Sequence, residues 1–290
     1  MEDMKTDLSI IFITYNSDDF IFKAIESVIA QNKYNHKLEI IVTDNSPVAN
    51  IDVELKKYDS ENISTVFTHN PANGGYGQGA NIAVSKASSE KILFLNPDVR
   101  LIEPIFHAAV EKLEEDPKKI VGFTLLDEND YAGQSYGILP EYYYLNWHFN
   151  RLHKKDYYSL YKKPFWNKRI WVSMAALGIN KQAILDAGGF DETMFLNTEE
   201  ADLFKRIPDR KVEVLSETIF HAGGHSLEGM EWRTATVLDS LKHYFDKYDH
   251  SWALYKYYNL TTCNIKRLVS KVRGKQNQWN DIMIEELTKR

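Results

Sequence analysis

Short apolar runs alternate with segments of helical spacing through the first hundred residues of the chain. The apolar runs lie at residues 8–14, 38–43, 63–68 and 91–95. They are rich in β-branched and bulky side chains, as strands buried on both faces are. Apolar residues at helical intervals indicate helices at residues 18–31, 80–87 and 103–115. Ser17 or Asp18 is the expected N-cap of the first helix, and Pro104 is expected in the first turn of the third. This alternation predicts an α/β fold with a mostly parallel sheet flanked by helices.

After Trp232 the spacing is helical to the end of the chain. We therefore expect an α/β domain over residues 1–230 and a helical extension over residues 231–290. Part of the extension is amphipathic, with an apolar face of Leu254, Tyr258, Ile265, Leu268, Val269 and Val272. The other positions carry Lys256, Lys266, Arg267, Lys271, Arg273 and Lys275. A basic amphipathic helix can lie on the inner-membrane surface. The same pattern also occurs in helices that pack on their own domain or on the second subunit of a homodimer.

Residues 129–170 interrupt the α/β pattern with aromatic and basic side chains. The segment contains Tyr142, Tyr143, Tyr144, Trp147, His148, Phe149, Arg151, His153, Lys154, Lys155, Tyr157 and Tyr158. Aromatic rings stack on sugars and basic side chains meet phosphates, so an insertion that binds an acceptor is one interpretation. A lid or a packed loop is the other. No RNA-binding motif accompanies the patch, which argues against nucleic acid.

Composition narrows the class of protein. The 290 residues are 43% hydrophobic and 26% charged, as globular chains are, and the net charge of −6 gives no reason to expect a nucleic-acid partner. Cys263 is the single cysteine, which excludes an intrachain disulfide and suits a reducing compartment. No apolar run has the length of a signal peptide or a membrane span. We therefore expect a cytoplasmic protein, either free or peripheral on the cytoplasmic face of the membrane.

Polar residues follow each of the expected strands. They are residues 15–17, 44–46, 70–79 and 96–98. Ligands bind at the carboxyl ends of the strands in such sheets, so the four segments predict a polar pocket on one rim. Asp44 could accept hydrogen bonds there from a nucleobase or ribose, or could form an Asx-turn.

The glycine-rich run from Asn73 to Asn81 does not have the dinucleotide fingerprint, because its glycines follow the third strand rather than the first. It can bring bare backbone close to a diphosphate and then begin a helix. Asp98, after the rigid turn at Pro97, is placed to hold Mg²⁺ or Mn²⁺ together with phosphate oxygens.

Three acids crowd into one short segment, Glu199, Glu200 and Asp202. Mutual repulsion should raise the pKa of at least one of them, which suits a general base. The alternative is that acids at a helix start complement the helix dipole.

Six motifs in order make the chain similar to the family 2 glycosyltransferases of the GT-A fold. They are Ile13-Thr14-Tyr15-Asn16, Val42-Thr43-Asp44-Asn45-Ser46, the glycine run from Asn73, Leu95-Asn96-Pro97-Asp98, Gly188–Glu192 with Glu199–Leu203, and His221-Ala222-Gly223-Gly224-His225-Ser226. The glycine run, the Asn-Pro-Asp turn and the histidine segment most resemble bacterial dTDP-rhamnosyltransferases of cell-surface polysaccharide synthesis.

The resemblance implies roles for individual residues. Contacts to the nucleotide-sugar are implied for Thr14, Tyr15, Asn16, Asp44, Asn73, Gly75, Gly77 and Asn96. Asp98 matches the metal-binding aspartate, with His221 as a second metal residue, and Asn96 replaces the first acid of that motif. Glu200 stands where the family's catalytic base is usually aspartate. Adjacent Glu199 is the alternative base, and Asp202 is expected to be structural or a cap.

The resemblance also implies a reaction. An inverting, metal-dependent transferase would move L-rhamnose from dTDP-rhamnose to a hydroxyl of a lipid-linked or other glycan acceptor, with Mg²⁺ or Mn²⁺. The alternatives are transfer of galactose, glucose or N-acetylglucosamine from a UDP-sugar, and a catalytically inactive module that binds a nucleotide-sugar or glycan.

Overall fold

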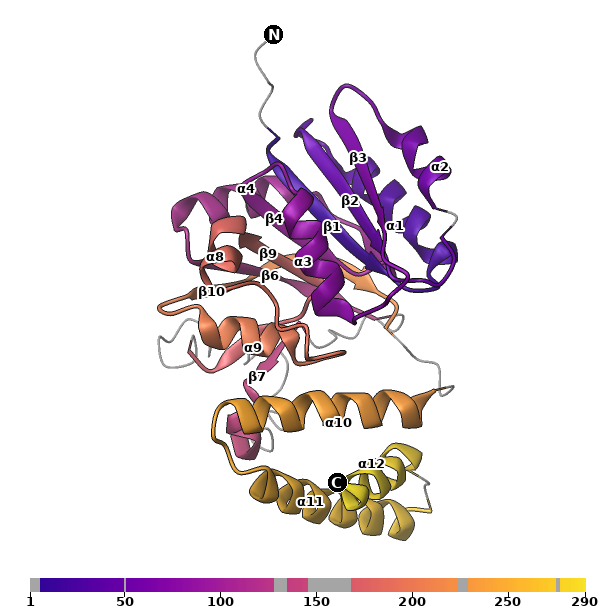
Figure 1. Ribbon diagram of the computed structural model, residues 1–290, viewed down its shortest axis with the longest axis vertical. Helices are drawn as coiled ribbons and strands as arrows, with labels where there is room; N and C mark the ends of the chain where they lie inside the picture. Colours follow the sequence, from indigo (N-terminus) through magenta and orange to yellow (C-terminus); the bar gives the residue numbers. More distant parts are fainter. Residues whose placement is uncertain (1–5, 50, 128–134, 146–167, 224–228, 275–276) are drawn as a thin grey trace.

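The computed structural model describes residues 6–49, 51–127, 135–145, 168–223, 229–274 and 277–290. It contains an eight-stranded sheet in the order β3-β2-β1-β4-β9-β6-β10-β5 (Figure 1). The strands are β1 (Leu8–Thr14), β2 (Leu38–Asp44), β3 (Ile63–His69), β4 (Lys91–Leu95), β5 (Val99–Leu101), β6 (Lys119–Leu126), β9 (Ala176–Asn180) and β10 (Lys211–His221). A second, two-stranded sheet joins β7 (Tyr136–Ile138) and β8 (Ile170–Val172).

The four strands expected from the apolar runs form the parallel half of the large sheet. β1 pairs in parallel with both β2 and β4, and β2 pairs in parallel with β3. The register places Thr14 opposite Asp44, and Asp44 opposite His69. The polar segments after these strands therefore meet on one rim, as the sequence predicts. In the other half, β9 runs antiparallel to β4 and β6, and β5 runs antiparallel to β10.

Helices cover both faces of this sheet. They include α1 (Asp18–Gln31), α2 (Asp52–Leu55), η1 (Lys56–Tyr58), α3 (Tyr76–Lys86), α4 (Phe106–Glu115), α8 (Lys181–Asp186) and α9 (Glu199–Arg206). Alternating residues of β1 divide between the faces, as the strand period requires. Ile10 and Phe12 pack with α1 and α4, whereas Ile11 and Ile13 pack with α3 and α9.

Two local expectations are corrected by the structure, and a third, the N-cap of α1, is confirmed in position. The second predicted helix begins at Tyr76, four residues before the expected start at residue 80, because Gly75 takes a positive φ of 92° as its N-cap. The third begins at Phe106 with Ile105 as N-cap, so Pro104 lies before its first turn. Ser17 is the N-cap of α1, but its hydroxyl donates to the Tyr15 carbonyl and caps no helix N–H.

Three helices follow the sheet at the C-terminal end. They are α10 (Met230–Lys247), α11 (Trp252–Val272) and α12 (Gln278–Lys289). In Figure 1, α10 lies between the α/β part of the molecule and α11 with α12. Leu238, Tyr244 and Phe245 of α10 join the core formed by α3 and α9, so this helix is packed directly on the α/β part.

One residue of the expected amphipathic face points elsewhere. Tyr258 is half-buried and packs against Tyr143, with ring centroids 5.0 Å apart. The side chain of Tyr257, which is 65% exposed, lies on the outer face of the helix instead. Sequence spacing shows which residues share a face of the helix. It does not show which face is buried, because that depends on where the neighbouring elements lie.

Most of the aromatic and basic segment at residues 129–170 lies outside the described residues. Tyr142, Tyr143 and Tyr144 belong to the short helix η2 (Pro140–Leu145). Among the described residues, none of the helices combines the length and the apolar character that a membrane crossing requires.

Candidate functional site

Hydrogen bonds between strand ends fix the rim around Asp44. The Thr14 hydroxyl and the Ser46 hydroxyl donate to Oδ1 of Asp44 at 2.9 and 2.6 Å, and the Ser46 N–H donates to the same atom at 3.1 Å. The Asn16 N–H in turn donates to the Ser46 hydroxyl at 2.7 Å. Oδ2 of Asp44 is buried and has no hydrogen-bond partner among the described residues. A buried oxygen of this kind is a ready acceptor for an N–H or O–H of a ligand.

The glycine run is held by backbone contacts to the loop before α9. The Tyr76 N–H donates to the Phe195 carbonyl at 3.1 Å, and a Cβ on Gly75 would lie 2.4 Å from that carbonyl oxygen. A Cβ on Gly77 would lie 3.3 Å from Cβ of Phe190. Gly77 thus faces protein backbone and side chains. These glycines allow α3 and the α9 loop to approach closely.

A pocket of about 300 Å³ opens at this rim. We call it the strand-end pocket; its lining includes Thr14, Tyr15, Asn45, Asn73, Gly75, Tyr76, Phe195, Trp232 and Arg233. Of the eight residues expected to contact a nucleotide-sugar, the structure thus brings Thr14, Tyr15, Asn73 and Gly75 together around one cavity. Asn16 and Asp44 support its wall by hydrogen bonds, and the roles of Gly77 and Asn96 as ligand contacts stay predictions.

Asp98 and His221 meet although they lie far apart in sequence. Oδ1 of Asp98 is 3.3 Å from Nε2 of His221, and the Asn96 side-chain nitrogen is 3.5 Å from the same ring nitrogen. The antiparallel pairing of β10 with β5 sets this approach, because it places His221 opposite Val99. Asp98 also lines a hollow of about 190 Å³ with Lys23 and Arg100.

The environment keeps Asp98 ionised. Burial acts to raise the pKa of Asp98, but the hydrogen bond and the charge of His221, with backbone N–H groups, outweigh it and hold the pKa below its usual range. No cluster of three or more His, Cys, Asp or Glu side chains suited to a metal is present in the described parts of the chain. One carboxylate and one imidazole fit a divalent cation that takes its other ligands from phosphate oxygens and water.

Glu199 and Glu200 form the first turn of α9 and are both buried, at 3% and 8% exposed. Oε2 of Glu199 accepts the Thr198 N–H at 2.8 Å. Oε2 of Glu200 is buried without a hydrogen-bond partner in the described structure. The two neighbours therefore differ: Glu199 is tied to its own helix terminus, and Glu200 keeps a free oxygen.

Burial raises the pKa of both glutamates above the usual range. For Glu200 the charge of Glu199 adds to the effect, while backbone N–H groups at the helix start oppose it. The pKa elevation that crowding alone suggested is thus mainly a consequence of burial. A carboxylate whose pKa approaches neutrality can accept and release a proton under ordinary conditions.

Asp202 has a different environment from the two glutamates. Its Oδ1 atom lies 2.7 Å from Nζ of Lys247 and accepts the Tyr248 hydroxyl at 2.7 Å, while Oδ2 accepts from Nε of Arg206 at 2.8 Å. Glu141 makes a parallel link, accepting from Lys205 at 2.6 Å and from the Tyr244 hydroxyl at 2.7 Å. These ion pairs and hydrogen bonds attach α9 to α10 and thereby fix the position of the glutamates.

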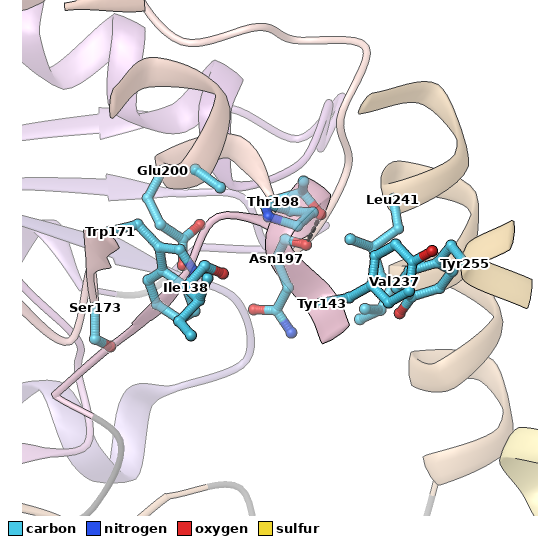
Figure 2. A pocket seen from close by; sticks show the side chains of 12 residues that line it. Ile138, Tyr143, Trp171, Ser173, Asn197, Thr198, Glu200, Val237, Leu241 and Tyr255 are labelled. Carbon is cyan, nitrogen blue, oxygen red and sulfur yellow. Dashed lines mark hydrogen bonds between the residues drawn. The ribbon is translucent and has the colours of Figure 1, made fainter. Parts of the chain in front are cut away.

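Glu200 lines a second cavity, of about 380 Å³, which we call the Glu200 cavity. Figure 2 shows Glu200, Trp171 and Ser173 on one side, Tyr143, Val237, Leu241 and Tyr255 on the other, and Asn197 with Thr198 between them. Val237 and Leu241 come from α10 and Tyr255 from α11. The C-terminal helices therefore form one wall of the cavity beside the candidate base.

Tyr76 was given no role by the sequence. Its ring lines the strand-end pocket, and its buried hydroxyl has no hydrogen-bond partner among the described residues. Burial and the charges of Glu199 and Glu200 raise the pKa of Tyr76 well above its usual range. The start of α3 lies against α9, because a Cβ on the adjacent Gly77 would be 3.8 Å from Cβ of Glu199. A tyrosine inside a glycine run was the only sequence signal for it.

The fold and the site define a class of protein. A mostly parallel sheet flanked by helices, with a polar pocket at its strand ends, is the architecture of GT-A glycosyltransferases. A family model described as Glycosyl transferase family 2 matches residues 9–168, more than half of the 290 residues. The chain belongs to this family.

The chain is similar to known proteins at low sequence identity, and two solved structures share its fold. The chain is 25% identical over 114 residues to the minor teichoic acid biosynthesis protein GgaB of Bacillus subtilis (strain 168), covering 39% of this chain and only 13% of that protein. TarS of S. aureus, residues 1–349 in complex with UDP-GlcNAc, has a TM-score of 0.52 and 17% identity, covering 82% of this chain and 72% of that one. The mannosyltransferase PcManGT of Pyrobaculum calidifontis, in complex with GDP-Man and Mn²⁺, has a TM-score of 0.57 and 14% identity, covering 81% and 62%.

Proposed function

We propose that this chain is an inverting, metal-dependent glycosyltransferase that moves L-rhamnose from dTDP-rhamnose to a hydroxyl of a lipid-linked glycan in cell-surface polysaccharide synthesis. The observation that carries the proposal is the placement of Glu200. Glu200 lines the cavity and has a buried oxygen without a hydrogen-bond partner among the described residues. The start of α3, which borders the strand-end pocket, lies against α9, because a Cβ on Gly77 would be 3.8 Å from Cβ of Glu199. A base of this kind, between a donor pocket and an acceptor cavity, suits direct displacement.

The strand-end pocket is the proposed donor site. Oδ2 of Asp44, which has no hydrogen-bond partner among the described residues, would accept the imide N–H of a thymine or uracil base. The Tyr15 ring, 52% exposed at the pocket mouth, offers a face on which the base can stack. Asn73 and the backbone at Gly75 would lie along the ribose and the diphosphate.

Asp98 and His221 are the proposed metal residues, with the amide of Asn96 beside them. A bound Mg²⁺ or Mn²⁺ supplies positive charge that stabilises the departing diphosphate. Asp98 stays ionised because His221 lowers its pKa, so the charge needed to hold a cation is present in the working pH range. PcManGT, a member of the same fold class, was solved with Mn²⁺.

The proposed chemical step uses Glu200 as base. Its carboxylate takes the proton of the acceptor hydroxyl, the oxygen forms a bond to the anomeric carbon, and the bond from that carbon to the diphosphate oxygen breaks. Attack occurs opposite the leaving group, so the configuration at the anomeric carbon inverts. Glu199 would remain a neighbour whose charge tunes the pKa of Glu200, because its own Oε2 is already bonded to the Thr198 N–H.

The Glu200 cavity is the proposed acceptor site. Trp171, Tyr143 and Tyr255 supply aromatic surface that suits the apolar faces of sugar rings, and Asn197 and Ser173 supply polar groups. Ile138, Pro140 and Tyr143 of the segment 129–170, which the sequence suggested as an acceptor region, are part of this cavity lining. The proposed reaction takes place on the cytoplasmic face of the membrane, where a lipid-linked acceptor would be presented.

A second candidate is transfer from a UDP-hexose. It is favoured by the TarS structure, which contains UDP-GlcNAc. The same Asp44 oxygen would accept the N–H of uracil, so this candidate differs from the first in the transferred sugar, in the base methyl group and in the 2′-hydroxyl of the ribose.

The test is a donor panel. Purified protein is incubated with dTDP-rhamnose, UDP-galactose, UDP-glucose or UDP-N-acetylglucosamine, a lipid-linked glycan acceptor and Mg²⁺ or Mn²⁺, and the product linkage is read by NMR. We expect rhamnosyl transfer with inversion. Turnover of a UDP-sugar instead would establish the second candidate. Donor binding without transfer from any donor would indicate a binding module.

A variant that fills the cavity tests the acceptor assignment separately. Val237→Trp adds bulk at the α10 wall and should raise the acceptor KM by at least about tenfold while leaving donor affinity unchanged. Val48→Trp, at a position 71% exposed, is the matched control. An unchanged acceptor KM in Val237→Trp would remove the cavity from the acceptor site.

A further inference from the structure

An exposed apolar stripe, broken only by Thr261, runs along α11. Leu254, Tyr257, Ile265, Leu268 and Val272 are 64%, 65%, 56%, 63% and 89% exposed. With exposed Thr261 between them, they follow one another at helical intervals and so lie on one face. Large apolar side chains gathered in one patch mark an interaction surface, whereas single ones are ordinary.

Basic side chains border this stripe, and acidic ones are absent from the helix. Lys256, Lys266, Arg267 and Lys271 lie within α11, which contains no Asp or Glu between Trp252 and Val272, and exposed Arg273 follows. Arg267 pairs with Asp281 of α12 at 3.0 Å. Lys266, Lys271 and Arg273 are exposed and form no ion pair within the described residues. This local charge contrasts with the net charge of −6 of the whole chain.

We infer that α11 docks on an anionic lipid surface, with the apolar stripe inserted among the headgroups and Lys266, Lys271 and Arg273 on lipid phosphates. The apolar face suits the acyl boundary of the lipid layer, and the basic side chains, with no acid in the helix, suit the anionic headgroups. A second copy of this chain fits less well. A two-fold dimer across the stripe would bring the basic borders of two α11 helices together, and like charges at such a contact repel.

The stripe and the Glu200 cavity are on different sides of the same helix. Leu254 points outward, while its neighbour Tyr255 is buried and lines the cavity. A helix with its side chains is about 10 Å across. Docking through α11 would therefore bring the acceptor cavity close to the lipid surface. This link to a lipid-linked acceptor rests on the proposed function, whereas the docking itself does not.

The experiment is co-sedimentation of the full chain with vesicles in the absence of any donor. Vesicles of phosphatidylglycerol mixed with phosphatidylcholine are compared with vesicles of phosphatidylcholine alone. We expect binding to the anionic vesicles at least about tenfold tighter than to the neutral ones, with a loss on addition of salt. Because no nucleotide-sugar is present, the outcome is independent of whether the proposed transfer occurs.

Two variants with matched controls identify the surface. Ile265→Ser with Leu268→Ser removes the centre of the stripe, and Val48→Ser with Val53→Ser removes two apolar side chains that are 71% and 75% exposed elsewhere. Lys266→Glu with Lys271→Glu reverses the charge of two basic side chains beside the stripe. Lys33→Glu with Lys118→Glu makes the same charge change at exposed positions far from α11. Each α11 variant should weaken vesicle binding about tenfold or more, and each control should bind as the unmodified chain does.

Thermal unfolding of all four variants should be unchanged, because the substituted side chains are exposed. Absence of vesicle binding, or equal binding by the unmodified chain and the α11 variants, overturns the proposal. A concentration-dependent dimer in analytical ultracentrifugation that dissociates in Ile265→Ser with Leu268→Ser also overturns it, in favour of a second copy on the stripe.

Discussion

Two acid-bearing regions at the site have opposite electrostatic environments. At the end of β4, Asp98 is half-buried beside His221, and that contact holds its pKa below the usual range. At the start of α9, Glu199 and Glu200 are buried and form no ion pair within the described residues, and their pKa values are raised. Environments that push the pKa values of acids apart indicate different chemical roles.

The difference assigns one role to each region. A carboxylate that stays ionised throughout the working pH range suits the binding of a cation, which in turn stabilises the departing diphosphate. A carboxylate that exchanges a proton near neutrality suits a base. Asp202 extends the comparison, because it lies in the same helix turn as Glu200 but is fully paired and has no free oxygen for a substrate.

The largest effect is expected from Glu200→Gln, which keeps the shape of the side chain and removes its basicity. Transfer should fall by about 10²- to 10⁴-fold, as for loss of a general base, while donor binding is retained. Single-turnover kinetics with calorimetry of donor binding separates the two quantities. Glu192→Gln, at an exposed acid of the adjacent loop, is the control. If Glu199→Gln proves the more damaging variant, the roles of the two glutamates are reversed.

Asp202→Ala should act on stability, because it leaves Lys247 and Arg206 without their shared partner. We expect the free energy of unfolding to fall by about 3 kcal/mol, at the lower end for a broken buried pair, since both cations can partly reach solvent. Urea denaturation measures it. Asp246→Ala, which breaks an exposed pair with Lys242 on α10, should cost less than about 0.5 kcal/mol. An equal loss of stability in the two variants would show that the ion pairs of Asp202 do not stabilise the fold.

Asp98→Asn should raise the metal concentration that the transfer reaction requires. We expect half-activation by Mn²⁺ at a concentration on the order of 100-fold higher, because the one charged oxygen ligand is lost. Asn96→Asp adds a second carboxylate beside His221 and should shift half-activation the other way. Identical Mn²⁺ titration curves for all three proteins would exclude Asp98 from a metal site.

The sequence predicted the parallel half of the fold because its information is local. Each of the strands β1 to β4 is an apolar run, and polar residues follow each run directly. The start of α3 was missed because it depends on a contact far away in sequence. Gly75 begins the helix early only because its backbone lies against Phe195.

The acid cluster was recognisable, but its surroundings were not. Sequence spacing placed Glu199, Glu200 and Asp202 together, whereas their separate roles depend on Lys247 and Tyr248 of the α10 end and on Tyr255 of α11. The aromatic lining of the Glu200 cavity likewise comes from three separate elements, η2, β8 and α11. Such convergence is set by tertiary packing, which single-sequence patterns do not encode.

The most direct test of the central claim is the pH dependence of transfer in the unmodified chain and in Glu199→Gln. A base is active when deprotonated, so activity falls as the pH drops through its pKa. Because the pKa of Glu200 is raised, this fall should begin well above the ordinary glutamate value of about 4.3. Glu199→Gln removes a neighbouring negative charge that raises this pKa, so the fall should move to lower pH. A fall that stays in place in Glu199→Gln, or that lies at the ordinary glutamate value in the unmodified chain, would contradict the account.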